Sequence, residues 1–337
     1  MREKIARRAQ KAIVEKVFPG CVIGIVEKNG KREVLPFGSL IYQTEKLDDS
    51  MIYHTAEPVR ETTVYDIASI TKSIPTASLI SLFIEEGRLR LTGKVCTYLP
   101  ELQNDRDATI EDLLLYRVHG VRLSELKDKT QQGILEHVFL EGFSAPSGKS
   151  EYTNLPALLL GIVAERVGGD TLDVFAQQYF FGPLKMAHTT FFPDAGNCAP
   201  TEIDGRGEVR GFPHDESAYV FAKAGRAVGH AGLFSTAPDI LDFLETLLRG
   251  DYPYIVRGAE AGLGWQLHEP YFMGTHAGAH TFGKTGFTGT SVVVDIARGI
   301  GLVILSNRTY PQRPPDAISP DCAINIFRRD IADIVFG

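Results

Sequence analysis

The sequence predicts an α+β protein in which one antiparallel sheet is built from both ends of the chain and carries an inserted helical lobe. Strand-like runs occur at 21–26 and 31–38, and strand signals return only after about residue 260. Between about 95 and 250 the chain reads as helical segments joined by loops rich in Gly and Pro. We therefore predict a sheet domain of residues 1–94 plus 250–337 and a mainly helical lobe of 95–249.

The N-terminal part of the chain predicts a helix followed by a hairpin. Residues 3–17 have the composition and apolar spacing of a helix. Asn29-Gly30 separates the first two strands and is the strongest short hairpin signal, because both residues tolerate positive φ. Residues 40–64 are polar and irregular, and we expect a loop that approaches the site.

The next segment places a serine and a lysine one helical turn apart. Residues 69–86 are apolar nearly all round, begin with Ser69-Ile70-Thr71-Lys72 and are followed by Gly87, so they predict a buried helix. Pro75 cannot donate a backbone hydrogen bond, and we expect a kinked or 3₁₀ first turn. A serine hydroxyl needs a nearby base, which an amine of lowered pKa can supply.

The rest of the chain predicts further helices and further strands. Apolar runs with helical periodicity, N-cap residues and glycine stops predict further helices at 155–167, 171–179, 236–248 and 323–335. Strand signals after about residue 260 predict further strands at 264–268, 281–285, 291–295 and 300–306.

Two more motifs lie in positions that suit a site. Tyr152-x-Asn154 follows the loop at 146–148 and precedes the helix at 155–167, where a side chain can point into a cleft. Lys284-Thr285-Gly286 ends a predicted strand, and a turn follows it. Each motif alone is common by chance. The order Ser-x-x-Lys, Tyr-x-Asn, Lys-Thr-Gly, each in its expected context, is specific.

With these motifs the chain resembles the serine β-lactamase and penicillin-binding-protein superfamily. The likeness is strongest to the branch of class C β-lactamases, D-alanyl-D-alanine peptidases and β-lactamase-like carboxylesterases, and it also covers 85–89, 229–236 and 286–291. The resemblance implies an α/β/α sandwich of the serine β-lactamase type, with the active site between the sheet domain and the helical lobe. It implies no cofactor and no metal.

The resemblance also implies roles for individual residues. Ser69 would attack the substrate carbonyl, and Lys72 with Tyr152 would form the proton-transfer pair, with either one as the base. Asn154 would hydrogen-bond Lys72 or the substrate amide. Lys284 would lower the pKa of Tyr152 and attract an anionic group of the substrate.

The strand-end motif would complete the substrate site. The resemblance places Thr285, Gly286 and Phe287 against the substrate, and the N–H groups of Ser69 and Phe287 would form the oxyanion hole. One stretch departs from the family: relatives have Thr-His-Thr-Ser-Gly where this chain has residues 116–120. We expect this change to alter packing behind the nucleophile helix and not the chemistry.

Composition argues against several other classes of function. A net charge of −7, a pI near 5.8 and the absence of a basic stripe disfavour nucleic-acid binding. No apolar run is long enough to span a membrane, and the N-terminus lacks the apolar core of a signal peptide, so we predict a cytoplasmic protein. The four cysteines are far apart and fit small buried residues in a reducing compartment.

Two rival types of site are also disfavoured. Residues 278–285 match the P-loop pattern, but no helix is predicted after Thr285 to hold phosphates. His119, His230, His276 and His280 are not at metal-ligand spacings, although His230 and His280 could line the pocket.

We therefore predict a serine hydrolase that forms an acyl-enzyme, most simply a carboxylesterase acting on small acyl esters. A β-lactamase or a D-alanyl-D-alanine peptidase is the alternative, since Lys284 suits a carboxylate-bearing substrate, whereas the absent signal peptide argues against cell-wall work. A scaffold that has lost catalysis is the alternative outside enzymology. The sequence predicts a small ester or amide substrate and leaves the oligomeric state open.

Overall fold

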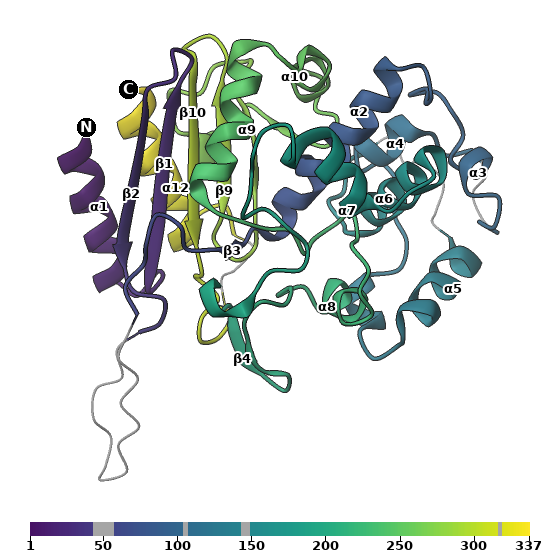
Figure 1. The fold of residues 1–337 in the computed structure, drawn as a ribbon, viewed down its shortest axis with the longest axis horizontal. Coiled ribbons are helices and arrows are strands. Elements are labelled where there is room, and N and C mark those ends of the chain that lie inside the picture. Colours follow the sequence, from purple (N-terminus) through teal and green to yellow (C-terminus); the bar gives the residue numbers. More distant parts are fainter. Residues whose placement is uncertain (43–56, 104–106, 143–148, 316–318) are drawn as a thin grey trace.

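The computed structural model describes residues 1–42, 57–103, 107–142, 149–315 and 319–337. Its central element is a six-stranded antiparallel sheet with strand order β2-β1-β10-β9-β8-β7 (Figure 1). Strands from the two ends of the chain are neighbours, since Cys21 of β1 lies opposite Ser306 of β10. The strands of this sheet are β1 (Gly20–Glu27), β2 (Arg32–Gly38), β7 (Gln266–Leu267), β8 (Phe282–Thr285), β9 (Ser291–Asp295) and β10 (Ile300–Ser306).

Helices cover both faces of the sheet and produce the predicted sandwich. Alternate residues of β1 point to opposite faces. Its odd-numbered residues from Cys21 to Ile25 pack in one core with α1 (Arg2–Val14) and α12 (Ala323–Phe336). Val22 and Val26 pack on the other face with α9 (Ala237–Arg249). The predicted fold class, including an antiparallel sheet built from both termini, is confirmed.

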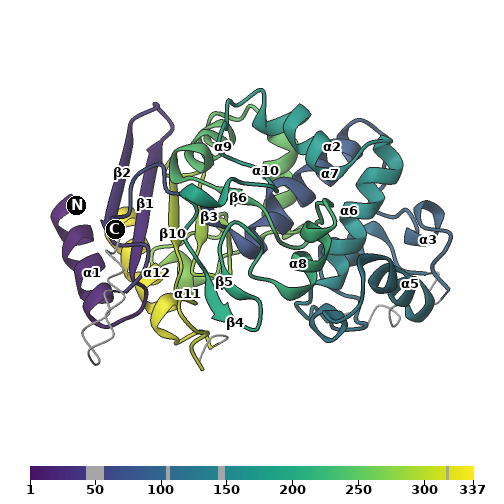
Figure 2. The same ribbon diagram turned by 60° about the horizontal axis from the view of Figure 1, so that its bottom comes forward.

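Most of the remaining helices form the lobe that lies to one side of the sheet (Figures 1 and 2). Its centre is α6 (Leu155–Gly168), which is apolar nearly all round and mostly buried. The other helices of the lobe and its border with the sheet are α2 (Ser78–Glu85), α3 (Val95–Tyr98), α4 (Ile110–Leu114), α5 (Gln131–Glu141), α7 (Leu172–Ala176), α8 (Glu216–Lys223) and α10 (Pro253–Glu260). The short helix α11 (Pro270–Met273) packs on α12 instead, in the core on that face of the sheet. Short strand pairs are β3 (Tyr65–Asp66) with β6 (Phe234–Ser235), and β4 (Glu202–Asp204) with β5 (Gly207–Val209).

The division into 1–94 plus 250–337 and 95–249 stays a prediction. One helix that it assigns to the lobe, α9, packs on β1 and β10 of the sheet. No helix in the described ranges is long and apolar enough to cross a membrane.

Three local predictions have different outcomes. The hairpin predicted at Asn29-Gly30 is confirmed, since β1 pairs with β2 on either side of it, and Gly30 has positive φ, at 87°. The strand predicted at 264–268 shortens to β7 (Gln266–Leu267), and Gly264 before it has positive φ. Much of the loop predicted at 40–64, and the whole of 146–148, lie outside the described residues.

The predicted helix at 69–86 is not continuous. A 3₁₀ segment, Ala68–Lys72, carries the Ser-x-x-Lys motif, and a wide turn, Ser73–Ala77, follows before α2 begins at Ser78. Ile74 leaves the helical region, with φ −117° and ψ 107°. Because a residue before proline disfavours helical geometry and Pro75 has no N–H, the sequence Ile74-Pro75 accounts for the break. The predicted irregular first turn is confirmed.

Candidate active site

Ser69 and Lys72 face each other in a buried part of the protein. Lys72 Nζ lies 2.8 Å from Ser69 Oγ and donates to the backbone oxygen of His230 at 2.7 Å. The Lys72 side chain is 1% exposed. This burial lowers the pKa of Lys72 to about 7, although the negative charge of Asp215 acts in the opposite direction. The amine is therefore partly neutral near pH 7, with its lone pair available to the serine hydroxyl.

Tyr152 lies between the two lysines of the predicted site. Its ring centre is 5.2 Å from Lys72 Nζ and 5.0 Å from Lys284 Nζ. The residue is 52% exposed, whereas its hydroxyl reaches inward to a hydrogen bond with Ser69. Burial of that hydroxyl raises the pKa of Tyr152 above its ordinary value, although the Ser69 hydrogen bond opposes the rise.

The prediction that Lys284 lowers the pKa of Tyr152 is therefore wrong. Lys284 is 1% exposed, and burial together with the nearby Lys72 lowers its own pKa well below the ordinary value. A lysine that gives up its proton on burial supplies little positive potential to a neighbouring phenol. Tyr152 is accordingly a phenol, not a phenolate, in the resting site.

Tyr116 is a site residue that the sequence reasoning missed. Its hydroxyl accepts a hydrogen bond from Lys284 Nζ at 3.1 Å, and its ring lies 5.1 Å from that of Tyr152. The residue is 8% exposed and has positive φ, at 53°, which is uncommon for a bulky side chain. We expected residues 116–120 to affect the packing behind the nucleophile helix, whereas Tyr116 also bonds a predicted site lysine. The departure from the family pattern is itself the signal that marks the position.

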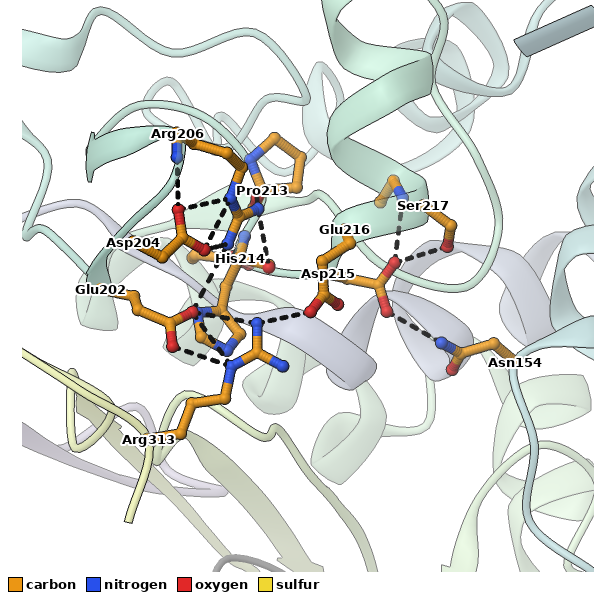
Figure 3. Close-up of polar contacts among 12 residues, drawn as sticks. Asn154, Glu202, Asp204, Arg206, Pro213, His214, Asp215, Glu216, Ser217 and Arg313 are labelled. Carbon is orange, nitrogen blue, oxygen red and sulfur yellow. Dashed lines mark hydrogen bonds and ion pairs between the residues drawn. The ribbon is translucent and has the colours of Figure 1, made fainter. Parts of the chain in front are cut away.

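Asn154 bonds a carboxylate rather than Lys72. Its Nδ2 donates to Asp215 Oδ2 at 2.8 Å (Figure 3). The other Asp215 oxygen accepts hydrogen bonds from Ser217 Oγ at 2.6 Å and from the backbone N–H of Ala218, and lies 3.3 Å from His230 Nε2. Burial raises the pKa of Asp215, but these partners outweigh it and hold that pKa well below its usual range. Asp215, which no motif singled out, is thus the negative charge of the site.

His230 belongs to the site through its backbone oxygen on Lys72, and its ring is fully buried beside Ser217. His280 does not line the site, because its ring is exposed and lies 3.3 Å from Glu260. The P-loop pattern is not realised, since Lys284 lies within β8 and the next element is the strand β9. The described residues contain no group of three or more side chains arranged to hold a metal ion.

The turn after β8, residues 286–290, is fastened to the segment that precedes Ser69. Thr288 Oγ1 donates to the oxygen of Asp66 at 2.7 Å, and Thr290 Oγ1 donates to that of Ile67 at 3.0 Å. Gly286 is required at this contact, because a Cβ there would lie 2.5 Å from the oxygen of Ile67. Two distant parts of the chain are thereby held at a fixed separation.

The predicted strand-end residues lie along this junction. Thr285 is half-buried at the end of β8 and shares a hydrogen bond with the Tyr271 hydroxyl. Within the described ranges, the backbone N–H groups of Ser69 and Phe287 donate to no protein acceptor. Two free N–H groups near a nucleophile are what an oxyanion hole requires.

A group of charged residues around His214, which includes Glu202, Glu216 and Arg313, packs against the turn at 286–290. His214 stacks on Phe287 with ring centres 5.5 Å apart, and its backbone N–H donates to Asp66 at 2.7 Å. Burial and the neighbouring arginines lower the pKa of His214 to about 3, so its ring is neutral. Arg313 pairs with Glu202 and Glu216 at the edge of this group (Figure 3).

Comparison with known proteins identifies the family of the chain. The family model described as "Beta-lactamase" matches residues 6–320. The chain is 30% identical to a putative D-alanyl-D-alanine carboxypeptidase of Escherichia coli K12, over 81% of this chain and 76% of the relative. It is 26% identical to an N-acetylmuramyl-L-alanine amidase of Bacillus subtilis, over 93% of this chain and 81% of the relative.

Solved structures share the fold at lower identity. EstCE1, a hydrolase with promiscuous acyltransferase activity, aligns over 100% of this chain and 98% of its own, with a TM-score of 0.76 and 20% identity. A class C β-lactamase aligns over 98% and 97%, with a TM-score of 0.73 and 16% identity. Since the family model spans almost the whole chain and the fold is that of its solved relatives, the chain belongs to the β-lactamase family.

Proposed function

We propose that this protein is a serine hydrolase that forms an acyl-enzyme on Ser69, and that its substrates are small carboxylic esters. The observation that carries the proposal is the 2.8 Å contact between Ser69 Oγ and a buried lysine whose pKa is lowered to about 7. A base of this pKa is suited to general base catalysis near neutral pH. A lysine kept only for a surface ion pair would not be buried without a carboxylate against its amine.

Acylation follows from the positions of these groups. Lys72 takes the proton of the Ser69 hydroxyl as Oγ forms a bond to the ester carbonyl carbon. The carbonyl oxygen becomes an oxyanion, which the N–H groups of Ser69 and Phe287 stabilise. When the bond to the alcohol oxygen breaks, the proton on Lys72 passes to that oxygen through the Tyr152 hydroxyl, which bonds Ser69.

Deacylation uses the same groups in reverse roles. A water molecule attacks the acyl carbon and gives one proton to Lys72 by way of Tyr152. The bond to Ser69 Oγ then breaks, and the proton returns to the serine. Asp215 offsets part of the penalty that burial imposes on the Lys72 ammonium, because its charge raises the pKa of Lys72. The cycle consumes one water and releases one acid and one alcohol.

The surroundings of Lys284 favour an uncharged acyl substrate. Its amine donates to the Tyr116 hydroxyl and lies against the rings of Tyr116 and Tyr152, so it is not presented to solvent. A buried lysine of lowered pKa is a poor partner for a substrate carboxylate. The second candidate is a D-alanyl-D-alanine carboxypeptidase, which the name of the E. coli relative favours.

Intact-mass spectrometry and turnover assays test the proposal together. The protein is incubated with p-nitrophenyl acetate, with nitrocefin and penicillin, and with a peptide ending in D-alanyl-D-alanine. We expect the ester to be turned over fastest, and an acyl adduct that is absent from Ser69→Ala. Ser81→Ala is the matched control, since Ser81 lies on α2 and its hydroxyl donates to the oxygen of Ala77 at the start of that helix.

Each of the other outcomes would indicate a different function. Faster release of D-alanine than of p-nitrophenol would replace the esterase by the peptidase, and faster opening of the β-lactams would replace it by a β-lactamase. No adduct and no turnover with any substrate would overturn the hydrolase and support a binding or scaffold role.

A further inference from the structure

The two N–H groups proposed for the oxyanion hole belong to peptide units whose orientation is fixed from behind. In a trans peptide the C=O of one residue and the N–H of the next point in opposite directions. The N–H of Phe287 therefore turns with the carbonyl of Gly286, and that of Ser69 turns with the carbonyl of Ala68. A side chain that hydrogen-bonds to either carbonyl therefore fixes the direction of the N–H group in the same peptide unit.

A buried arginine grips the carbonyl of Gly286. Arg328, on α12, donates through Nη2 to the oxygen of Gly286 at 2.8 Å and to that of Thr290 at 2.7 Å. Its Nη1 donates to Asn325 Oδ1 at 2.7 Å, and the side chain is 3% exposed. One guanidinium nitrogen thus spans the turn at 286–290, with the Phe287 N–H on the opposite side of its peptide.

Thr71 fixes the peptide unit that carries the other proposed donor, the N–H of Ser69. Thr71 Oγ1 donates to the oxygen of Ala68 at 2.7 Å, and the side chain is fully buried. Its hydroxyl also accepts the N–H of Leu233 at 3.2 Å, which fixes its rotation. The peptide that carries the Ser69 N–H is therefore clamped by a side chain within the Ser-x-x-Lys motif.

A purely structural role explains Arg328 poorly. Among the described residues no carboxylate lies within ion-pair distance of its guanidinium, and a buried cation without one is costly. Burial and the nearby Arg308 lower the pKa of Arg328 to about 9, so it is still charged at pH 7. Because a charged donor on the Gly286 carbonyl polarises that peptide, it strengthens the N–H at the other end.

We infer that Arg328 is a positioning residue for the oxyanion hole, aiming and polarising the Phe287 N–H, with Thr71 as its neutral counterpart for the Ser69 N–H. The inference rests on the acyl-enzyme proposed above. It assigns to the C-terminal helix a part in transition-state stabilisation, although Arg328 itself touches no substrate.

The test compares two buried arginines that hold adjacent carbonyls of one turn. Arg308, 7% exposed, donates through Nε to the oxygen of Phe287 at 2.8 Å, which belongs to the next peptide unit. Kinetics on p-nitrophenyl acetate and melting temperatures are measured for Arg328→Met, Arg328→Lys and Arg308→Met. Thr71→Val is included because its shape matches threonine.

We expect Arg328→Met to lower kcat roughly 100-fold with KM little changed, the usual cost of one oxyanion donor, and Thr71→Val to lower it about 10-fold. Arg328→Lys should regain part of the loss, and the pH midpoint near 7 set by Lys72 should stay in place. Equal losses of kcat in Arg328→Met and Arg308→Met at equal melting temperature would overturn the inference. An unfolded Arg328→Met leaves the decision to Arg328→Lys and Thr71→Val, where unchanged kcat in both would overturn it. A wild type that forms no adduct would overturn the proposed function and this role together.

Discussion

The two walls of the site each supply one buried lysine, and the two are equally hidden from solvent. Lys72, from the segment before α2, is 1% exposed and lies against Ser69 Oγ and a backbone oxygen. Lys284, from β8, is also 1% exposed but has a phenol as its partner. Asp215 raises the pKa of Lys72, whereas Lys72 lowers that of Lys284. Burial alone therefore does not set the two lysines apart. Their neighbours do, and the proposed base is the lysine whose amine lies against the serine hydroxyl.

The largest expected effect is a difference in activity between variants of the two lysines. Lys72→Met removes the proposed base, and we expect kcat/KM on p-nitrophenyl acetate to fall by roughly 10³-fold or more. Lys284→Met removes a group that contacts Tyr116 and Tyr152 but not the serine, and we expect a loss of about 10-fold. In the wild type, activity should rise with pH through about 7, where Lys72 loses its proton.

Equal losses in the two variants would break this comparison and make both lysines part of one base. Far-ultraviolet circular dichroism and melting temperatures distinguish lost chemistry from lost fold in each variant.

The next effect is on stability, and its sign follows from the lowered pKa. Lys72 has a pKa of about 7 in the folded protein against 10.5 unfolded, so the unfolded chain binds more protons between these values. The wild type should therefore gain stability as pH rises from 7 towards 10. Lys72→Met should have a larger free energy of unfolding than the wild type at pH 7. This difference should decrease by about 3 kcal/mol between pH 7 and pH 9.5.

Urea unfolding at pH 7 and pH 9.5 measures this difference. A difference between Lys72→Met and the wild type that is independent of pH would show that Lys72 is protonated in the folded protein throughout.

The smallest expected effect concerns the partner of Lys284. Tyr116→Phe removes the acceptor of the Lys284 hydrogen bond but keeps the ring. We expect the freed Lys284 amine to take up a proton when it faces a substrate carboxylate, so the ratio of D-alanine release to ester turnover should rise about 5-fold. A fall in ester turnover with an unchanged ratio would instead place Tyr116 in proton transfer, and Tyr98→Phe, in the α3 region of the lobe, provides a tyrosine control.

Much of the fold and part of the candidate site could be predicted from the sequence. Strand signals near both chain ends predicted the sheet, because hydrophobic alternation and Asn-Gly turns are local properties. Ser-x-x-Lys predicted a local pair, and its two residues lie in contact. The catalytic and substrate-binding roles of all the predicted site residues stay predictions: Ser69, Lys72, Tyr152, Asn154, Lys284, Thr285, Gly286 and Phe287.

What sequence could not predict depends on contacts between distant segments. Asp215 lies far along the chain from Asn154 and carries no motif, yet it accepts the bond expected to go to Lys72 or to substrate. Tyr116 lies in a stretch recognised only as a departure from the family. The pKa of Tyr152 is raised by burial, which depends on contacts between distant segments, and among the described residues only the Ser69 hydrogen bond opposes that rise.

The pairing of β1 with β10 has a consequence for how the chain is made. Cys21 and Ser306 are opposite each other in the sheet, so the apolar first strand has its central neighbour only after almost all of the chain has been synthesised. Both faces of the β1–β2 hairpin stay incompletely covered until α9 and α12 have been synthesised, because these helices also come late in the sequence. We expect expression to depend on chaperones or low temperature, because an unpaired apolar strand is where aggregation begins.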